Sequence, residues 1–197
     1  MPEELKVKGK TIRLIQDDIT ALEIEAWVYY ARPDLALGSG YGTAVAVRGG
    51  PQVAEELKKL GPLAVGEAVV TGAGTLKARH IVHAVGPRFQ EQDLEGKLRQ
   101  TIQSALQRAD EKKISRLAFP AMGAGFYGVP LALCAKVCLE TAKQYLEGAT
   151  GLIEIVFCLR DSREYAPFAQ QFKKMGGASV APAAAPVRAA AAVAAAL

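Results

Sequence analysis

The chain has 197 residues, 50% of them hydrophobic and 22% charged, which is enough apolar material to pack one domain of ordinary size. Its 24 Lys and Arg against 20 Asp and Glu leave a formal net charge of +4, too small to indicate a dedicated nucleic-acid binder, although a nucleic acid stays open as a partner. No apolar run approaches the roughly 18 to 20 residues that cross a bilayer, and residues 1–10 are too charged for a signal peptide. We therefore expect a cytoplasmic protein with no membrane partner.

Short runs rich in β-branched residues alternate with longer amphipathic segments along most of the chain. We predict strands at 11–16, 26–30, 67–71, 80–85, 116–120 and 154–159. We predict helices at 43–60 with a break near 49–51, at 93–112 behind the cap Asp93, from Pro130 through Tyr145, and at 163–174. This alternation is typical of an α/β fold with a partly parallel sheet, in which ligands collect beyond the carboxyl ends of the strands.

The composition changes after Met175. Two glycines, Gly176 and Gly177, introduce a stretch rich in Ala and Pro that has no amphipathic period. We expect residues 175–197 to form a flexible tail that does not belong to the folded domain.

Three cysteines, Cys134, Cys138 and Cys158, are too few and too unevenly spaced for a disulfide framework. Cys134 and Cys138 lie four apart in a helical pattern, but no further Cys or His ligand stands near them. We expect buried thiols in a reducing compartment, with no metal and no cofactor.

Two glycine-rich segments follow predicted strands and lead into predicted helices, where backbone N–H groups can hold phosphate oxygens. We name them loop one (37–42) and loop two (123–128). Each alone is also consistent with a simple turn, and neither matches a P-loop or a dinucleotide-binding turn. Asp18 ends the first predicted strand, either as a ligand acceptor or as a helix cap, while His83 inside an apolar strand is favoured as a core residue.

Together these segments resemble the macrodomain family. The similarity rests on Gln-Asp-Asp-Ile-Thr at 16–20, Gly-Glu-Ala-Val-Val-Thr-Gly-Ala-Gly at 66–74, Ile-Val-His-Ala-Val-Gly-Pro at 81–87 and Phe-Pro-Ala-Met-Gly-Ala-Gly-Phe-Tyr-Gly-Val-Pro at 119–130. These motifs keep the family's order, so we expect one macrodomain-like domain over 8–174. The resemblance implies a three-layer α/β/α sandwich with a mixed sheet of roughly six strands and a cleft for ADP-ribose.

The same resemblance implies the roles of individual residues. Asp18 would accept from the adenine amine beside the Ile19 backbone, and the two loops would surround the diphosphate and distal ribose. Arg160 stands nearest to the position where relatives carry an aromatic residue that stacks on adenine. The implied ligand-binding residues are Asp18, Ile19, Gly38, Ser39, Gly40, Tyr41, Gly123, Ala124, Gly125, Phe126, Tyr127 and Arg160.

The departures from the family pattern bear on catalysis. Hydrolytic members carry Val-Asn-Ala-Ala-Asn where this chain has Val-Tyr-Tyr-Ala-Arg at 28–32, so Tyr29 and Arg32 replace both asparagines. Many of them also carry an Asp after the glycines of loop one, where this chain has Gly42. We therefore expect no catalytic residue.

We favour binding of ADP-ribose, free or attached to protein, or of a related ADP-containing nucleotide. One alternative is an ADP-ribosyl hydrolase that uses water positioned by the substrate. A second alternative is a degenerate macrodomain that serves as an interaction module.

Overall fold

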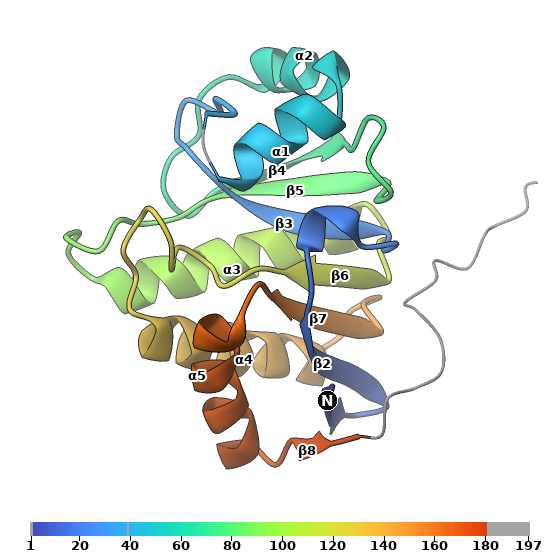
Figure 1. Cartoon of the computed structure of the whole chain (residues 1–197), viewed down its shortest axis with the longest axis vertical. Helices are drawn as coiled ribbons and strands as arrows, with labels where there is room; N and C mark the ends of the chain where they lie inside the picture. Colours follow the sequence, from blue (N-terminus) through green and yellow to red (C-terminus); the bar gives the residue numbers. More distant parts are fainter. Residues whose placement is uncertain (1, 39, 181–197) are drawn as a thin grey trace, which may run out of the picture.

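The structure is a computed structural model that describes residues 2–38 and 40–180. Figure 1 shows one sheet with helices on both of its faces. In chain order the elements are β1 (Glu3–Val7), β2 (Lys10–Gln16), the 3-10 helix η1 (Ile19–Ala21), β3 (Ala26–Ala31), α1 (Tyr41–Arg48), α2 (Pro51–Leu60), β4 (Ala68–Gly72), β5 (His80–Val85), α3 (Leu94–Glu111), β6 (Arg116–Phe119), α4 (Leu131–Glu147), β7 (Glu154–Leu159), α5 (Ser162–Lys174) and β8 (Ala178–Ser179).

The strands form an eight-stranded mixed sheet in the order β4-β5-β3-β6-β7-β2-β1-β8. The central strands β5, β3, β6, β7 and β2 run parallel to one another, and β4 and β1 pair antiparallel outside them. Because parallel strands end on the same edge of a sheet, the segments that follow β2, β3, β6 and β7 gather there.

Side chains of β3 show how the two faces are covered. All six residues of this central strand are buried. Val28 and Tyr30 pack in a cluster with residues of α3, α4 and α5, while Trp27 and Tyr29 pack in a second cluster with residues of α1 and α2. The alternation follows from the period of two in a strand, and it confirms the three-layer α/β/α fold.

The prediction of about six strands is corrected to eight. The six predicted strands are all present, and β1 and β8 extend the sheet at one side. β1 pairs antiparallel with β2, and the two residues of β8 pair with Glu3 and Glu4 of β1. The run Glu-Glu-Leu-Lys-Val has one β-branched residue, Val7, and lacks the enrichment of the other strands. Of the predicted tail at 175–197, residues 181–197 lie outside the described part of the chain.

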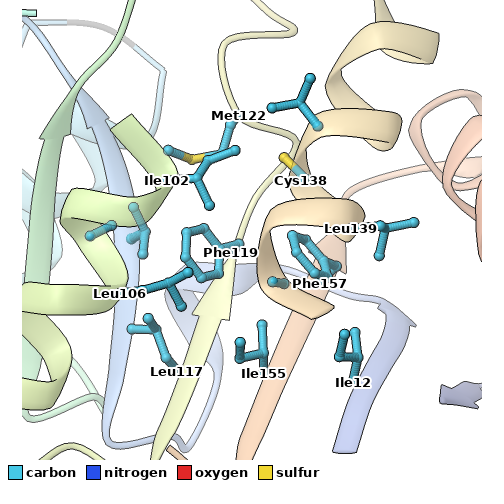
Figure 2. Packing of buried hydrophobic residues seen from close by; sticks show 14 of the residues in the cluster. Ile12, Ile102, Leu106, Leu117, Phe119, Met122, Cys138, Leu139, Ile155 and Phe157 are labelled. Carbon is cyan, nitrogen blue, oxygen red and sulfur yellow. The ribbon is translucent and has the colours of Figure 1, made fainter. Parts of the chain in front are cut away.

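The larger of the two core clusters is centred on aromatic rings between the sheet and α3, α4 and α5. Figure 2 shows Phe119 and Phe157 beside Ile102, Leu106 and Leu139. The rings of Phe119 and Phe157 are stacked with centroids 5.5 Å apart. This packing holds β6 and β7 side by side beneath the edge at which the ligand cleft is predicted.

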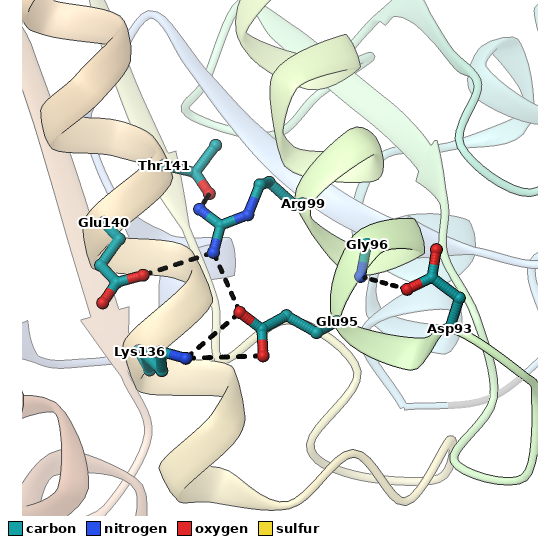
Figure 3. Close-up of polar contacts among 7 residues, drawn as sticks. All are labelled: Asp93, Glu95, Gly96, Arg99, Lys136, Glu140 and Thr141. Atoms are coloured by element: carbon teal, nitrogen blue, oxygen red, sulfur yellow. Dashed lines mark hydrogen bonds and ion pairs between the residues drawn. The ribbon is translucent and has the colours of Figure 1, made fainter.

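Polar contacts on the outer surface join α3 to α4 (Figure 3). Arg99 pairs with Glu95 at 3.2 Å and with Glu140 at 3.3 Å, and Lys136 reaches Glu95 at 3.2 Å. Asp93 caps α3 as predicted, accepting from the Gly96 backbone N–H. These partly exposed ion pairs link the two helices, and each contributes little to the free energy of unfolding.

No helix within residues 2–38 and 40–180 has the length and apolarity to cross a membrane.

Candidate functional site

A pocket of about 740 Å³ opens at the carboxyl ends of the parallel strands. Its walls come from β3 and from the segments after β2, β6 and β7, which are neighbours in the sheet, and from the start of α1. We call its two sides the β2 side, with Asp18, Arg48 and Arg160, and the loop side, with Tyr29 and loop two. The sheet topology therefore places the predicted segments around one cavity.

Asp18 on the β2 side is held by two neighbours. Its Oδ1 accepts from the Thr20 backbone N–H at 2.9 Å and from the Thr20 hydroxyl at 2.7 Å, and its Oδ2 accepts from Arg48 Nη1 at 3.2 Å. Burial raises the pKa of Asp18, but these hydrogen bonds and the positive charge of Arg48 outweigh it, so the pKa lies below the usual value. Asp18 is a charged acceptor at neutral pH.

Arg160 follows β7 and lines the same pocket as Arg48. Its guanidinium pairs with Glu164 at 3.7 Å, and its backbone N–H donates to the same carboxylate at 2.9 Å. Tyr41, the first residue of α1, also lines the pocket, and burial raises its pKa to about 12. The β2 side thus combines a neutral phenol, two guanidinium groups and three carboxylates, those of Asp17, Asp18 and Glu164.

Loop two lines the opposite side with backbone and aromatic surface. Gly123 has a φ of +73°, and a Cβ there would meet Tyr30 and Val129, so this position requires glycine. Gly125 borders the pocket with open space where a Cβ would be. Phe126 is 83% exposed at the pocket, while the ring of Tyr127 packs 4.8 Å from that of Tyr30.

The Tyr29 hydroxyl occupies the space that a side chain at position 42 would need. A Cβ on Gly42 would overlap the Tyr29 hydroxyl, so the tyrosine and the glycine fit each other. Burial raises the pKa of Tyr29 to about 12, which leaves its hydroxyl protonated at neutral pH. Tyr30 is also held as a phenol, because burial raises its pKa and its hydroxyl donates to the Pro87 carbonyl.

Arg32, at the end of β3, pairs with Asp34 through two hydrogen bonds of 2.8 and 3.1 Å. Its guanidinium lies 3.5 Å from where a Cβ on Gly38 would stand, beside loop one. The positive charge of Arg32 is therefore already paired with the carboxylate of Asp34.

His83 lies behind Tyr29 and not in the pocket, as its place in an apolar strand predicts. Its Nε2 is 2.8 Å from the Thr71 hydroxyl, and its ring packs edge-on to Tyr29 at 5.8 Å. Burial lowers the pKa of His83 to about 3. The imidazole is neutral and serves packing.

We predict an acid sensitivity from this histidine. In the unfolded chain the histidine takes up its proton at a pKa of about 6.5, before the folded protein does. The contribution of neutral His83 to the free energy of unfolding is therefore complete above that pH and is lost as the pH falls toward 3. At about pH 5 the free energy of unfolding should drop by about 2 kcal/mol relative to about pH 7, measured by urea unfolding. The His83→Gln variant should lack that drop. Parallel pH profiles for the two proteins would contradict the assignment.

All three cysteines are buried and free, as predicted. The Sγ atoms of Cys134 and Cys138 are 3.9 Å apart on α4, and burial raises the pKa of the Cys134 thiol. Within the described residues no group of three or more His, Cys, Asp or Glu is arranged to hold a metal ion.

The structure brings together most of the predicted site residues. Those that border the pocket are Asp18, Gly40, Tyr41, Gly123, Gly125, Phe126, Tyr127 and Arg160. The Ile19 side chain is fully buried, Gly38 lies beside Arg32, and Ala124 packs against the core, while Ser39 lies outside the described residues. Lining residues absent from the predicted set are Asp17, Thr20, Tyr29, Tyr30, Ala44, Arg48, Pro120, Ala121 and Glu164.

Comparison with known proteins decides the family. The sequence model of the Macro domain matches residues 31–138. The chain belongs to the macrodomain family. A macro domain-containing protein of Caldanaerobacter subterraneus subsp. tengcongensis is 35% identical over 170 residues, which cover 83% of this chain and 97% of that protein. This macrodomain has Tyr29, Arg32 and Gly42 at the positions where the family resemblance implies two asparagines and an aspartate in hydrolytic members.

Solved macrodomains share its fold. The Oceanobacillus iheyensis macrodomain, solved with ADP, superposes with a TM-score of 0.84 at 24% identity, over 89% of this chain and 96% of that one. The Trypanosoma brucei macrodomain, solved in complex with ADP-ribose, superposes with a TM-score of 0.76 at 26% identity, over 81% of this chain and 68% of that one.

Proposed function

We propose that this macrodomain binds ADP-ribose or a related ADP-containing nucleotide in the pocket between its two glycine-rich loops and Asp18. The observation that carries the proposal is the convergence of Asp18, loop one, loop two and Arg160 on one pocket from four separate segments. Its volume of about 740 Å³ falls within the range of small-molecule sites. Relatives solved with ADP and with ADP-ribose support the choice of ligand.

Backbone groups on the loop side would hold the diphosphate. Loop one leads through Gly40, at a φ of +57°, into the first turn of α1, where N–H groups and the helix dipole favour an anion. Loop two presents Gly125 and its neighbours to the same cavity. A glycine lets the backbone come close to a phosphate because no Cβ stands in the way.

The β2 side would hold the base. Oδ1 of Asp18 accepts two hydrogen bonds from Thr20. Oδ2 accepts one, from the exposed Arg48, and keeps a lone pair for a ligand in the pocket. An adenine amine donating to Oδ2 would meet a charged acceptor that is already oriented. Arg160 would lie against the base as a planar cation.

Binding is favoured over hydrolysis by the fit of Tyr29 to Gly42. Hydrolysis near neutral pH commonly uses a positioned water and a group that takes its proton. No acidic residue stands between Asp34 and Glu55, and burial holds the pKa of Tyr29 near 12. The natural partners would be free ADP-ribose or ADP-ribosylated protein.

Calorimetric titration with ADP-ribose, ADP, AMP and NAD tests this proposal, with Asp18→Ala as the first variant. Wild-type protein should give selective heat for ADP-ribose. Asp18→Ala should weaken binding roughly ten- to a hundredfold, because the base amine loses a charged acceptor. Asp18→Asn keeps an acceptor oxygen and should lose less. Unchanged affinity in a folded Asp18→Ala protein would refute the role of Asp18.

We also expect little or no release of ADP-ribose from mono-ADP-ribosylated protein, even when this macrodomain saturates the modified substrate. The reason is the missing base at Gly42 and the neutral phenols around it. Single-turnover assays with labelled ADP-ribose measure the release. Efficient release that a Tyr29 or Tyr41 substitution abolishes would make the protein a hydrolase with a rearranged site.

A further inference from the structure

Arg48 is a pocket residue whose position no loop motif explains. It is the last residue of α1, and its side chain is 56% exposed on the β2 side of the pocket. Its Nη1 donates to the Thr20 hydroxyl at 2.8 Å and to Asp18 Oδ2 at 3.2 Å. The Thr20 hydroxyl donates in turn to Asp18 Oδ1 at 2.7 Å. The three side chains therefore form a closed ring of hydrogen bonds at the pocket wall.

This ring sets a hydrogen-bond donor beside an acceptor. Thr20 occupies Oδ1 of Asp18, so Oδ2 is the oxygen left for a ligand, and the guanidinium is its immediate neighbour. A guanidinium carries five N–H donors, of which Nη1 has satisfied two partners through Thr20 and Asp18. Further donors remain for a ligand atom lying next to the one that contacts Oδ2.

The other charges on this side do not duplicate the arrangement. Arg160 pairs with Glu164 at 3.7 Å and lies 3.8 Å from Asp161, so its charge is matched away from Asp18. Asp17 accepts from the Asp18 backbone N–H at 2.7 Å through its Oδ1. Arg48 is thus the guanidinium that pairs with Asp18, the proposed acceptor of the base amine.

We propose that Arg48 is a specificity-determining residue that donates a hydrogen bond to the ring nitrogen adjacent to the base amine bound by Asp18. The inference rests on the proposed function, because it concerns the base of the same ligand. On adenine, the amine has the ring nitrogen N1 on one side and N7 on the other. The acceptor Asp18 could therefore bind the amine while the donor Arg48 binds one of these nitrogens. A base without that nitrogen leaves the guanidinium without its ligand partner, which lowers the affinity for that base.

Titrations with ADP-ribose and with its 1-deaza and 7-deaza-adenine analogues test this inference on wild-type protein and Arg48→Met. Methionine keeps the apolar stem and removes the donors. We expect Arg48→Met to weaken ADP-ribose about five- to tenfold, and to weaken one of the two deaza analogues by less than about twofold, since that analogue has already lost the acceptor. Arg160→Met is the matched control and should weaken all three ligands by the same factor.

The outcomes separate the two proposals. If wild-type protein fails to bind ADP-ribose, the proposed function and this inference both fall. If it binds, but Arg48→Met weakens all three ligands equally, Arg48 acts merely by holding Asp18 and this inference alone falls. Equal affinities of wild-type and Arg48→Met for ADP-ribose, with circular dichroism showing both folded, would overturn it as well. Arg48→Lys provides a second variant that keeps the charge and should restore part of the ADP-ribose affinity without restoring the difference between the analogues.

Discussion

Replacing Gly125 by glutamate is expected to abolish nucleotide binding while leaving the fold intact. A Cβ at Gly125 would have no atom within 4 Å, so the glutamate can be attached there without displacing the backbone. It borders the pocket at loop two, where the diphosphate is proposed to lie. The glutamate adds bulk and a charge of the same sign as the phosphates, which should weaken ADP-ribose by roughly a hundredfold or more in calorimetric titration.

Two variants at the same position separate the causes. Gly125→Gln adds nearly the same volume without charge and should lose less affinity than Gly125→Glu. Gly125→Ala adds a single methyl group, so it should lose less affinity than either of the larger side chains. Retained heat for Gly125→Glu, with unchanged circular dichroism, would show that loop two does not contact the phosphates.

The largest effect on stability is expected from Phe157→Ala. Phe157 is fully buried on β7, with its ring centroid 5.5 Å from Phe119 and 5.6 Å from Phe168. Truncation loses the transfer free energy of the ring and leaves a cavity between the sheet and α5, at a cost of about 3–5 kcal/mol. Guanidinium unfolding of the two proteins measures the difference.

Phe126→Ala is the matched control, since this ring is 83% exposed. Its free energy of unfolding should stay within about 0.5 kcal/mol of wild type. If Phe157→Ala were equally harmless, the aromatic cluster would not be the centre of the core. A folded Phe157→Ala protein should still recognise the same nucleotide, with reduced thermal stability.

Hydrophobic periodicity was sufficient to predict the interior of this fold. Strands buried on both faces carry long β-branched runs, as β5 does with Ile-Val-His-Ala-Val, and amphipathic helices such as α3 repeat an apolar residue every three or four positions. The break between α1 and α2 followed from Gly49, Gly50 and Pro51. Such signals are local, so a single sequence is enough to reveal them.

The edge of the sheet was missed because its signals are not local. β1 alternates charged and apolar residues over only five positions, and β8 is two residues long. Both exist because a neighbouring strand offers unpaired backbone groups, which is a property of the assembled sheet. Sequence periodicity carries no record of that pairing.

In the candidate site, too, some residues could be predicted from local sequence signals and others could not. Glycine loops and Asp18 stand in contiguous motifs, so their predicted positions needed no tertiary information. Arg48 and Glu164 reach the pocket from the end of one helix and the first turn of another, and a lone charged residue on a helix is most often a solvated one. The fit of Tyr29 to Gly42 joins residues on different elements and emerges from the packing.

The pairing of β2 with β7 also fixes when the site can form during synthesis. β2 is made before both loops and its parallel partner β7 after them, with Thr11 opposite Glu154 and Gln16 opposite Leu159. Such long-range pairings form late, because closing the long intervening loop costs entropy before the paired residues make their contacts. A nascent chain that still lacks β7 already carries loop one and loop two, but it has no strand to seat β2 and so cannot bring Asp18 to them. The proposed binding site is therefore completed from its β2 side, after β7 has left the ribosome.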